Sequence, residues 1–178
     1  GAANATSVDV PALTTANIYL RAGYPGGIID GSSAYQTALS GPWATAVDAQ
    51  GNVYIADIGN HRIRFVPKTG GTYFGQAMAA NYIYTIAGNG SAGYLGDNVA
   101  ATSTQINSPG GVTVDASGNI YIADINNNRI RFVPKTGGTY FGQSMTANYI
   151  YTIAGNGTGG YLADNVGATS TRINFPYG

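Results

Sequence analysis

The sequence predicts an all-β protein built from repeated four-stranded antiparallel units, and three observations support this prediction. First, residues 62–76, RIRFVPKTGGTYFGQ, recur unchanged as residues 129–143, inside a longer near-identical match of residues 44–109 with 111–176. Second, apolar residues alternate with a period of two within each copy, as in β-strands. Third, all eight acidic residues are Asp, none is Glu, and 27 residues are Gly. Because Glu favours helices whereas Asp and Gly favour turns, this composition argues against a helical protein.

Each copy predicts four strands in the same order. In the first copy they are TAVD (45–48), NVYIAD (52–57), RIRFV (62–66) and YIYTIA (82–87), and in the second VTVD (112–115), NIYIAD (119–124), RIRFV (129–133) and YIYTIA (149–154). The turns DAQGN and GNHR, with their counterparts DASGN and NNNR, supply the Asp, Gly and Asn of tight turns. Pro67 and Pro134 end the third strand, because proline cannot donate to a strand ladder. Four-stranded antiparallel units repeated along a chain are the blades of a β-propeller.

Two segments of each copy lie between the predicted strands. A glycine-rich excursion, KTGGTYFGQAMAAN (68–81), joins the third and fourth strands, so we expect it to project from an edge or face of the blade. A return segment, DNVAATSTQIN (97–107), leads to the next copy and has room for one short helical turn. The identity of the excursion in both copies has two interpretations: a recent duplication, or a contact surface used twice.

The spaced motifs of the second copy resemble those of the bacterial NHL-repeat propellers. They are PGGVTVDASGNIYIADINNNRIRFV (109–133), IYTIAGNG (150–157), YLADN (161–165) and ATSTRIN (168–174), and the resemblance covers about residues 17–178. The excursion departs from this family's pattern, because it lengthens the blade beyond the usual forty-odd residues of propeller repeats.

The predicted organisation is an incomplete ring with two full blades plus partial ones. We expect an N-terminal extension at 1–16, a partial blade at 17–40 that begins with a lone fourth-type strand (17–22), blades at 41–107 and 108–174, and the start of a further blade at 175–178. Closed propellers need about four to eight blades. The sequence therefore predicts part of a longer propeller, several copies in one ring, or copies added head to tail as a fibre.

Composition restricts the classes of function. Net charge is zero and only 9% of residues are charged, so no global field attracts nucleic acid or an anionic membrane. The chain has no Cys, which excludes disulfides and thiolate zinc sites, and no apolar run approaches the roughly 20 residues of a membrane span. We expect no cofactor and no metal ion.

Three N-x-S/T sequons indicate an extracellular setting, because N-glycosylation marks secreted proteins. They stand at Asn4, Asn89 and Asn156, and two of them recur because the repeat recurs. The first residues, GAANATSVDVPALTT, lack the basic and apolar regions of a signal peptide, which fits a processed secreted chain or a cytosolic one. We expect a secreted or cell-surface protein.

Several motifs that suggest chemistry have simpler structural interpretations. GNGSAG (88–93) and GNGTGG (155–160) match a dinucleotide fingerprint, but no helix follows them, so we expect glycine turns. His61, the single histidine, is expected to be an exposed turn residue. The aspartates that follow strands recur at equivalent positions and either accept turn amides or line a channel that binds cations; they are Asp48, Asp115, Asp57, Asp124, Asp30, Asp97 and Asp164.

Two groups of residues are candidate contact sites. The arginines of the third strand are spaced by two and share a face, which predicts either a basic stripe near tyrosines for RNA or sugar or a solvated face that protects a strand edge; they are Arg62, Arg64, Arg129 and Arg131. The aromatic residues of the excursion, Tyr73, Phe74, Tyr140 and Phe141, offer large contact area, unless the excursion folds back and buries its own rings. The neutral charge balance argues against nucleic acid.

The sequence predicts a non-enzymatic scaffold or interaction module that makes repeated contacts. The expected partners are other copies of the chain, in a ring or fibre, or the rest of a longer propeller, and a protein or carbohydrate ligand remains open. The alternative is an enzyme, because some similar propellers are lactonases or lyases with a metal ion in the central channel. Near-identical blades and a single histidine speak against that alternative, since active sites require repeats to diverge.

Overall fold

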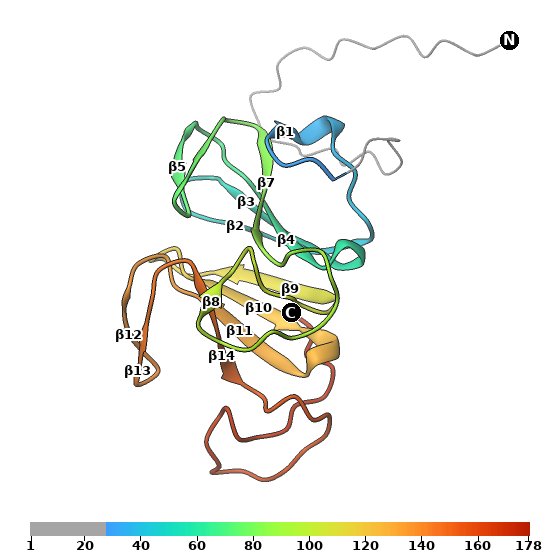
Figure 1. Cartoon of the computed structure of the whole chain (residues 1–178), viewed down its shortest axis with the longest axis vertical. Helices are drawn as coiled ribbons and strands as arrows, with labels where there is room; N and C mark the ends of the chain where they lie inside the picture. Colours follow the sequence, from blue (N-terminus) through green and yellow to red (C-terminus); the bar gives the residue numbers. More distant parts are fainter. Residues whose placement is uncertain (1–27) are drawn as a thin grey trace, which may run out of the picture.

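The computed structural model describes residues 28–178. Their main strands form two five-stranded antiparallel sheets, which pack against each other (Figure 1). In blade 1 the strands are β1 (Ser32–Ser33), β2 (Pro42–Val47), β3 (Val53–Asp57), β4 (Arg62–Val66) and β7 (Tyr82–Ala87), in the order β1-β7-β4-β3-β2. In blade 2 they are β8 (Val99–Ala100), β9 (Pro109–Val114), β10 (Ile120–Asp124), β11 (Arg129–Val133) and β14 (Tyr149–Ala154), in the order β8-β14-β11-β10-β9. The predicted all-β fold of antiparallel blades is confirmed, and the two sheets do not close a ring.

The predicted four strands of each blade are present, with a fifth that the sequence analysis missed. The return segment adds this fifth strand, β1 or β8, to the outer edge of the blade that follows it. The helical turn expected in residues 97–107 is absent: these residues form β8 and hydrogen-bonded turns. Short 3₁₀ turns occur elsewhere, at η1 (Ala34–Gln36), η2 (Ile58–Asn60) and η3 (Ile125–Asn127).

The glycine-rich excursion is a second hairpin in each blade. In blade 1 it consists of β5 (Gly71–Tyr73) and β6 (Gln76–Met78), and in blade 2 of β12 (Gly138–Tyr140) and β13 (Gln143–Met145). In blade 1, the two-residue turn between β5 and β6 has φ of 51° at Phe74 and 76° at Gly75, the left-handed pair that matches the twist of a hairpin. Each hairpin forms a two-stranded sheet separate from the main sheet of its blade (Figure 1).

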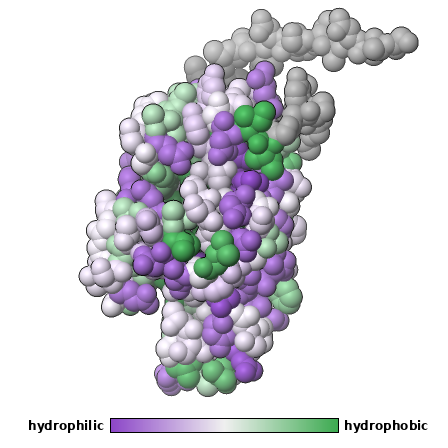
Figure 2. Space-filling model, in the orientation of Figure 1, coloured by the Kyte–Doolittle hydropathy of each residue, from purple (hydrophilic) through white to green (hydrophobic). Residues whose placement is uncertain are grey.

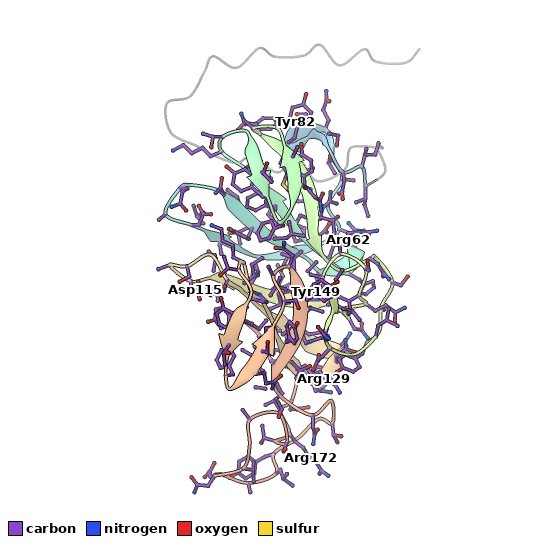
Figure 3. The ribbon with its side chains drawn as sticks, turned by 60° about the vertical axis from the view of Figure 1, so that its left-hand side comes forward. Arg62, Tyr82, Asp115, Arg129, Tyr149 and Arg172 are labelled. Atoms are coloured by element: carbon purple, nitrogen blue, oxygen red, sulfur yellow. The ribbon has the colours of Figure 1, made fainter. Side chains whose placement is uncertain are left out.

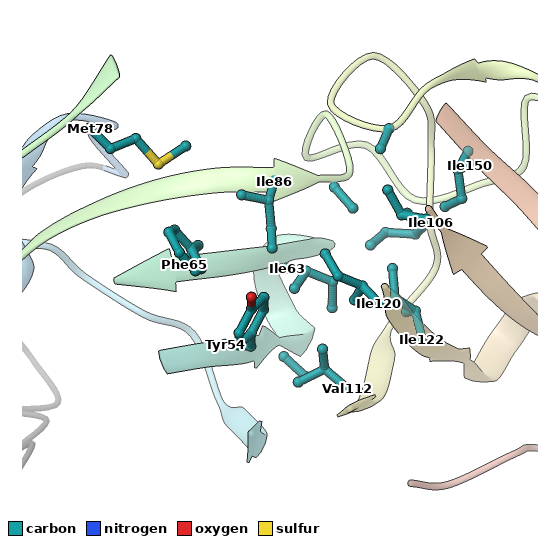
Figure 4. Close-up of a cluster of buried hydrophobic side chains, with 14 residues drawn as sticks. Tyr54, Ile63, Phe65, Met78, Ile86, Ile106, Val112, Ile120, Ile122 and Ile150 are labelled. Carbon is teal, nitrogen blue, oxygen red and sulfur yellow. The ribbon is translucent and has the colours of Figure 1, made fainter. Parts of the chain in front are cut away.

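The main core lies between the two blades (Figure 4). The face of blade 1 that carries Tyr54, Ile63 and Phe65 packs against the face of blade 2 that carries Ile120 and Ile122. We call these the back face of blade 1 and the front face of blade 2. Alternating strand residues point to opposite faces, so the other residues of each sheet form a front face on blade 1 and a back face on blade 2.

Parts of the predicted domain organisation lie outside the described residues: the extension 1–16, the lone strand 17–22 and the sequon at Asn4. Residues 175–178, expected to begin a further blade, form no strand, and the ring of Tyr177 lies 6.5 Å from that of Trp43. Among residues 28–178, no helix is long and apolar enough to cross a membrane.

Candidate interface between blades

The loop of residues 88–101 leaves blade 1 and attaches to the outer edge of blade 2. Its strand β8 pairs antiparallel with β14, and the amides of Asn98 and Ala101 donate to the carbonyls of Ile150 (3.0 Å) and Asn148 (2.9 Å). The loop therefore supplies backbone partners to a strand that would otherwise be an open edge.

Asp97 anchors this loop through a buried arginine. The Arg131 side chain is fully buried, and its Nη2 donates to Asp97 Oδ1 (3.1 Å) and to the Gly96 carbonyl (2.8 Å). Its Nη1 donates to Asp124 Oδ2 at 3.4 Å. The backbone N–H and hydroxyl of Thr152 also donate to Asp97 Oδ1, at 3.0 and 2.9 Å. One carboxylate thus joins the loop to two strands of the next blade.

Further side chains of the same loop contact blade 2. The Tyr94 ring lies over the guanidinium of Arg129, 3.8 Å from its central carbon, a cation–π contact. Asn98 Oδ1 accepts a hydrogen bond from the Tyr151 hydroxyl (2.8 Å), and Asn127 Nδ2 donates to the Gly93 carbonyl (2.7 Å). Figure 3 labels Arg129 on blade 2, close to this loop. The cluster of Tyr94, Asp97 and Asn98 is called the hook below.

Blade 1 has a weaker counterpart of the hook in residues 28–34. Asp30 Oδ1 accepts from Arg64 Nη2 (2.7 Å) and from the Thr85 hydroxyl (2.9 Å), and β1 pairs with β7. Gly31, however, stands where the hook has Asn98. Within the described part of the chain, Nε of both Arg64 and Arg131 is buried without a hydrogen-bond partner, and in Arg64 Nη1 lacks one as well.

The expectation of a basic stripe on the third strand is therefore wrong for two of its four arginines. Arg64 and Arg131 are fully buried and paired with aspartates, so neither faces solvent or a ligand. Burial lowers the pKa of the Arg64 guanidinium, an effect that Asp30 and Asp57 oppose. Arg62 and Arg129 are half-buried and donate to loop carbonyls, including those of Asn89 and Asn156 at 2.9 Å.

The aspartates at the ends of β3 and β10 hold the entry to each blade. Asp57 Oδ1 accepts from the Ser40 amide (2.8 Å), and Asp124 Oδ1 accepts from the Asn107 amide (2.7 Å). Burial raises the pKa of both carboxyls, although their hydrogen bonds oppose the shift. The interpretation as acceptors of turn amides is confirmed. In residues 28–178, no three Asp or His side chains gather as metal ligands would.

The aspartates in the turns between β2 and β3 and between β9 and β10 have the same structural role. Asp48 Oδ1 accepts from the Gln50 and Asn52 amides, and Asp115 Oδ1 accepts from those of Ser117 and Asn119. Partial burial would raise the pKa of Asp115, but the hydrogen bonds that it accepts lower it overall. Burial and Asp48 together raise the pKa of Tyr54.

The excursion aromatics fold back on their own blades. The rings of Tyr73 and Phe74 lie 5.2 and 5.3 Å from that of Phe65, and the Tyr73 hydroxyl donates to the Thr69 carbonyl. Tyr140 and Phe141 make the equivalent contacts with Phe132. Phe141 nevertheless remains 60% exposed, whereas Phe74 is half-buried, so the two blades differ at this position.

The remaining sequence candidates occupy loops. Asn89 and Asn156 are exposed, and each accepts the amide two residues ahead, from Ser91 and Thr158 at 2.9 Å. Both GNG motifs form glycine turns, as expected. His61 is half-buried, and its Nδ1 accepts the Ser108 amide (3.1 Å), so it contacts the next loop instead of solvent alone.

Sequence reasoning missed Tyr94 and Asn98. The available signal was the recurrence of Y-L-[AG]-D-N at 94–98 and 161–165. An open, shallow pocket of about 270 Å³ adjoins the hook, with Tyr94, Asp97, Arg129 and Thr152 among its lining residues. It is formed by the loop and blade 2 together.

Comparisons with known proteins agree with this architecture. The model of the family "NHL repeat" matches residues 39–64 and 107–131, one match in each blade. The protein SUPPRESSOR OF QUENCHING 1, chloroplastic, from Arabidopsis thaliana is 27% identical over 104 residues, which are 58% of this chain and 9% of that protein.

A solved structure is similar in fold alone. It is an auxiliary nutrient binding protein from Bacteroides thetaiotaomicron, with a TM-score of 0.51 and 19% identity over 74% of this chain and 30% of that one. The chain thus spans less than a third of either protein. Each of the two NHL-repeat matches lies within one antiparallel blade, so both blades are similar to the repeats of NHL-type β-propellers.

Proposed function

We propose that the chain is a non-enzymatic scaffold or interaction module, acting at an extracellular site through repeated contacts between blades. In this proposal the back face of blade 2 binds another blade, as the back face of blade 1 binds blade 2. That other blade belongs to a second copy of the chain, so the chain self-assembles.

One observation carries this proposal: side chains at equivalent positions of the back face are more buried in blade 1 than in blade 2. Tyr54 and Ile63 are buried between the blades, whereas their counterparts Tyr121 and Ile130 are half-buried. We take this residual apolar surface as the interaction site, because the equivalent face of blade 1 already packs against a blade in the same molecule.

The chemistry of the face also supports a protein contact. Phe132, Met145 and Tyr151 form a cluster against which Tyr121 and Ile153 pack, so the face is aromatic and aliphatic. Aromatic residues and Met are enriched at protein interfaces, where they supply contact area at low entropic cost. The carboxylates that an enzyme would need, such as Asp57 and Asp124, are already committed to backbone amides.

Light scattering across a concentration series, with electron microscopy of the same samples, tests the proposal. We expect masses above that of one chain, as rings or fibres, and a shift toward the monomer in Phe141→Ser. Phe74→Ser is the matched control, because it removes the same ring contacts within a blade but from a half-buried position, so it should lower thermal stability without shifting the mass toward the monomer. Self-assembly is contradicted if the wild-type chain keeps the mass of a monomer at every concentration.

A further inference from the structure

Residues 155–178 repeat the loop of residues 88–111, and their first contacts are already formed. The Gly155 amide donates to the Ala168 carbonyl (2.9 Å) as that of Gly88 does to Ala101 (2.9 Å). The Asn156 amide donates to the Thr171 carbonyl at 2.9 Å.

The base of this second loop is also fixed to its own blade. The Phe175 amide donates to Asn128 Oδ1 (3.0 Å), just as the Ser108 amide donates to His61 Nδ1 (3.1 Å). The base of the loop therefore already has the conformation of its counterpart, which lowers the entropic cost of binding.

Within the described residues, the distal half of the loop forms no counterpart of the contacts that the hook makes with blade 2. Tyr161, Asp164 and Asn165 stand where the hook has Tyr94, Asp97 and Asn98. Within the described residues, Asp164 and Asn165 form no hydrogen bond or ion pair, and Tyr161 is 72% exposed against 37% for Tyr94. Figure 2 shows apolar surface at the lower end of the molecule, where this loop lies, and its exposed apolar residues include Leu162 and Val166.

Blade 1 presents the chemistry that such a hook recognises. Its Arg64 occupies the place of Arg131, and its Tyr84 that of Tyr151. Residues 28–34, which attach there in blade 1, provide Asp30 but have Gly31 and Ser32 where the loop bound to blade 2 has Asn98 and Val99. A hook of the sequence YLADNV would offer the Tyr84 hydroxyl an amide oxygen and β7 an apolar strand.

We propose that residues 161–168 bind blade 1 of a second copy of this chain and take the place of that copy's residues 28–34. Asp164 then pairs with Arg64, Asn165 accepts from the Tyr84 hydroxyl, and residues 166–167 pair with β7. Tyr161 lies over Arg62, as Tyr94 lies over Arg129. This brings the back face of blade 2 onto the front face of the partner's blade 1, so copies add head to tail.

This inference rests on the proposed self-assembly and specifies its route. It also predicts that the partner's residues 28–34 compete with the incoming hook. Because the competing segment belongs to the same chain, its high effective concentration makes exchange dependent on protein concentration.

Disulfide cross-linking tests the contact directly, because the chain contains no cysteine. At the outer edge of blade 2, Ala100 of β8 pairs with Tyr149 of β14, and the equivalent pair between copies is Gly167 with Tyr82. Directly opposed residues of neighbouring strands are close enough for a disulfide. Mixing Gly167→Cys with Tyr82→Cys under mild oxidation should give the mixed dimer in excess over either homodimer on a non-reducing gel.

The matched control places both cysteines in the existing contact. The double variant Ala100→Cys, Tyr149→Cys should close within one chain and migrate as a monomer. If this control closes but the mixed dimer does not exceed the homodimers, the proposed contact is wrong.

Two aspartate variants should have opposite effects on association measured by light scattering. Asp164→Asn weakens the incoming hook and should shift the chain toward the monomer. Asp30→Asn weakens the competing segment and should shift it toward larger assemblies. Equal effects of the two variants would overturn the proposal. Assembly of the wild type without the mixed cross-link would overturn this route alone, whereas a monomer at all concentrations would overturn the proposed self-assembly as well.

Discussion

Blade 1 and blade 2 have nearly the same sequence but differ in what covers them. Ile63 of blade 1 is fully buried between the sheets, and the identical residue of blade 2, Ile130, is half-buried. Phe74 and Phe141 show the same difference. The burial of a propeller residue therefore depends on its neighbouring blade as much as on its own, and substitutions in the two blades should have unequal effects.

The largest difference is expected between Ile63→Ala and Ile130→Ala. Removing a fully buried Ile side chain costs about 2–5 kcal/mol, because a cavity remains, and the half-buried counterpart should cost clearly less. Urea unfolding of both variants measures this difference. Equal losses would mean that a further contact covers the back face of blade 2 in solution.

A smaller difference is expected between Asp97→Ala and Asp164→Ala. The first variant removes a partner of the buried Arg131, and leaving buried donors unsatisfied costs about 1–3 kcal/mol. The second alters an exposed carboxylate without a partner among the described residues, so stability at low protein concentration should change by less than about 0.5 kcal/mol. Thermal unfolding in dilute solution compares them, and a large loss in Asp164→Ala would show a contact within the chain.

The smallest effects concern pH, where we expect the blades to behave alike. Burial raises the pKa of Asp57 and Asp124, so the folded state binds protons more tightly than the unfolded state. Their contribution to stability is present below the unfolded value, near 3.8, and is lost as pH rises through the folded value. Asp115, whose pKa is lowered, contributes above 3.8, and its contribution is lost as pH falls through its folded value.

Carboxyl carbon NMR titration measures these midpoints. We expect Asp57 and Asp124 to titrate above 3.8 and Asp115 below it. If Asp57 and Asp124 instead titrate in opposite directions, the two blades do not bury this residue alike.

Local structure was the most predictable part of the molecule. The strands β3, β4, β7 and their counterparts follow from alternation and from the prolines that end β4 and β11. The hairpins β2–β3 and β9–β10 were predictable because Asp48 and Asp115 cap their turns through contacts only two to four residues away. Such contacts depend on neighbouring residues, which the sequence specifies directly.

The contacts of the arginines and of the hook were not predictable in this way. Arg64 and Arg131 have the spacing of a solvated stripe, but both are fully buried and pair with aspartates 34 residues earlier in the chain. The strands β1 and β8 are two residues long, too short for a periodic pattern, and form because an open edge lies beside them.

The sequence by itself therefore determined the all-β class, the two NHL-type blades and the turn roles of Asp48 and Asp115, because these depend on local backbone preferences and on a repeated pattern. Only the tertiary structure decided which identical residues are covered, which arginines are buried and where each hook binds. Those properties depend on packing between blades, where two copies of one sequence can have different neighbours.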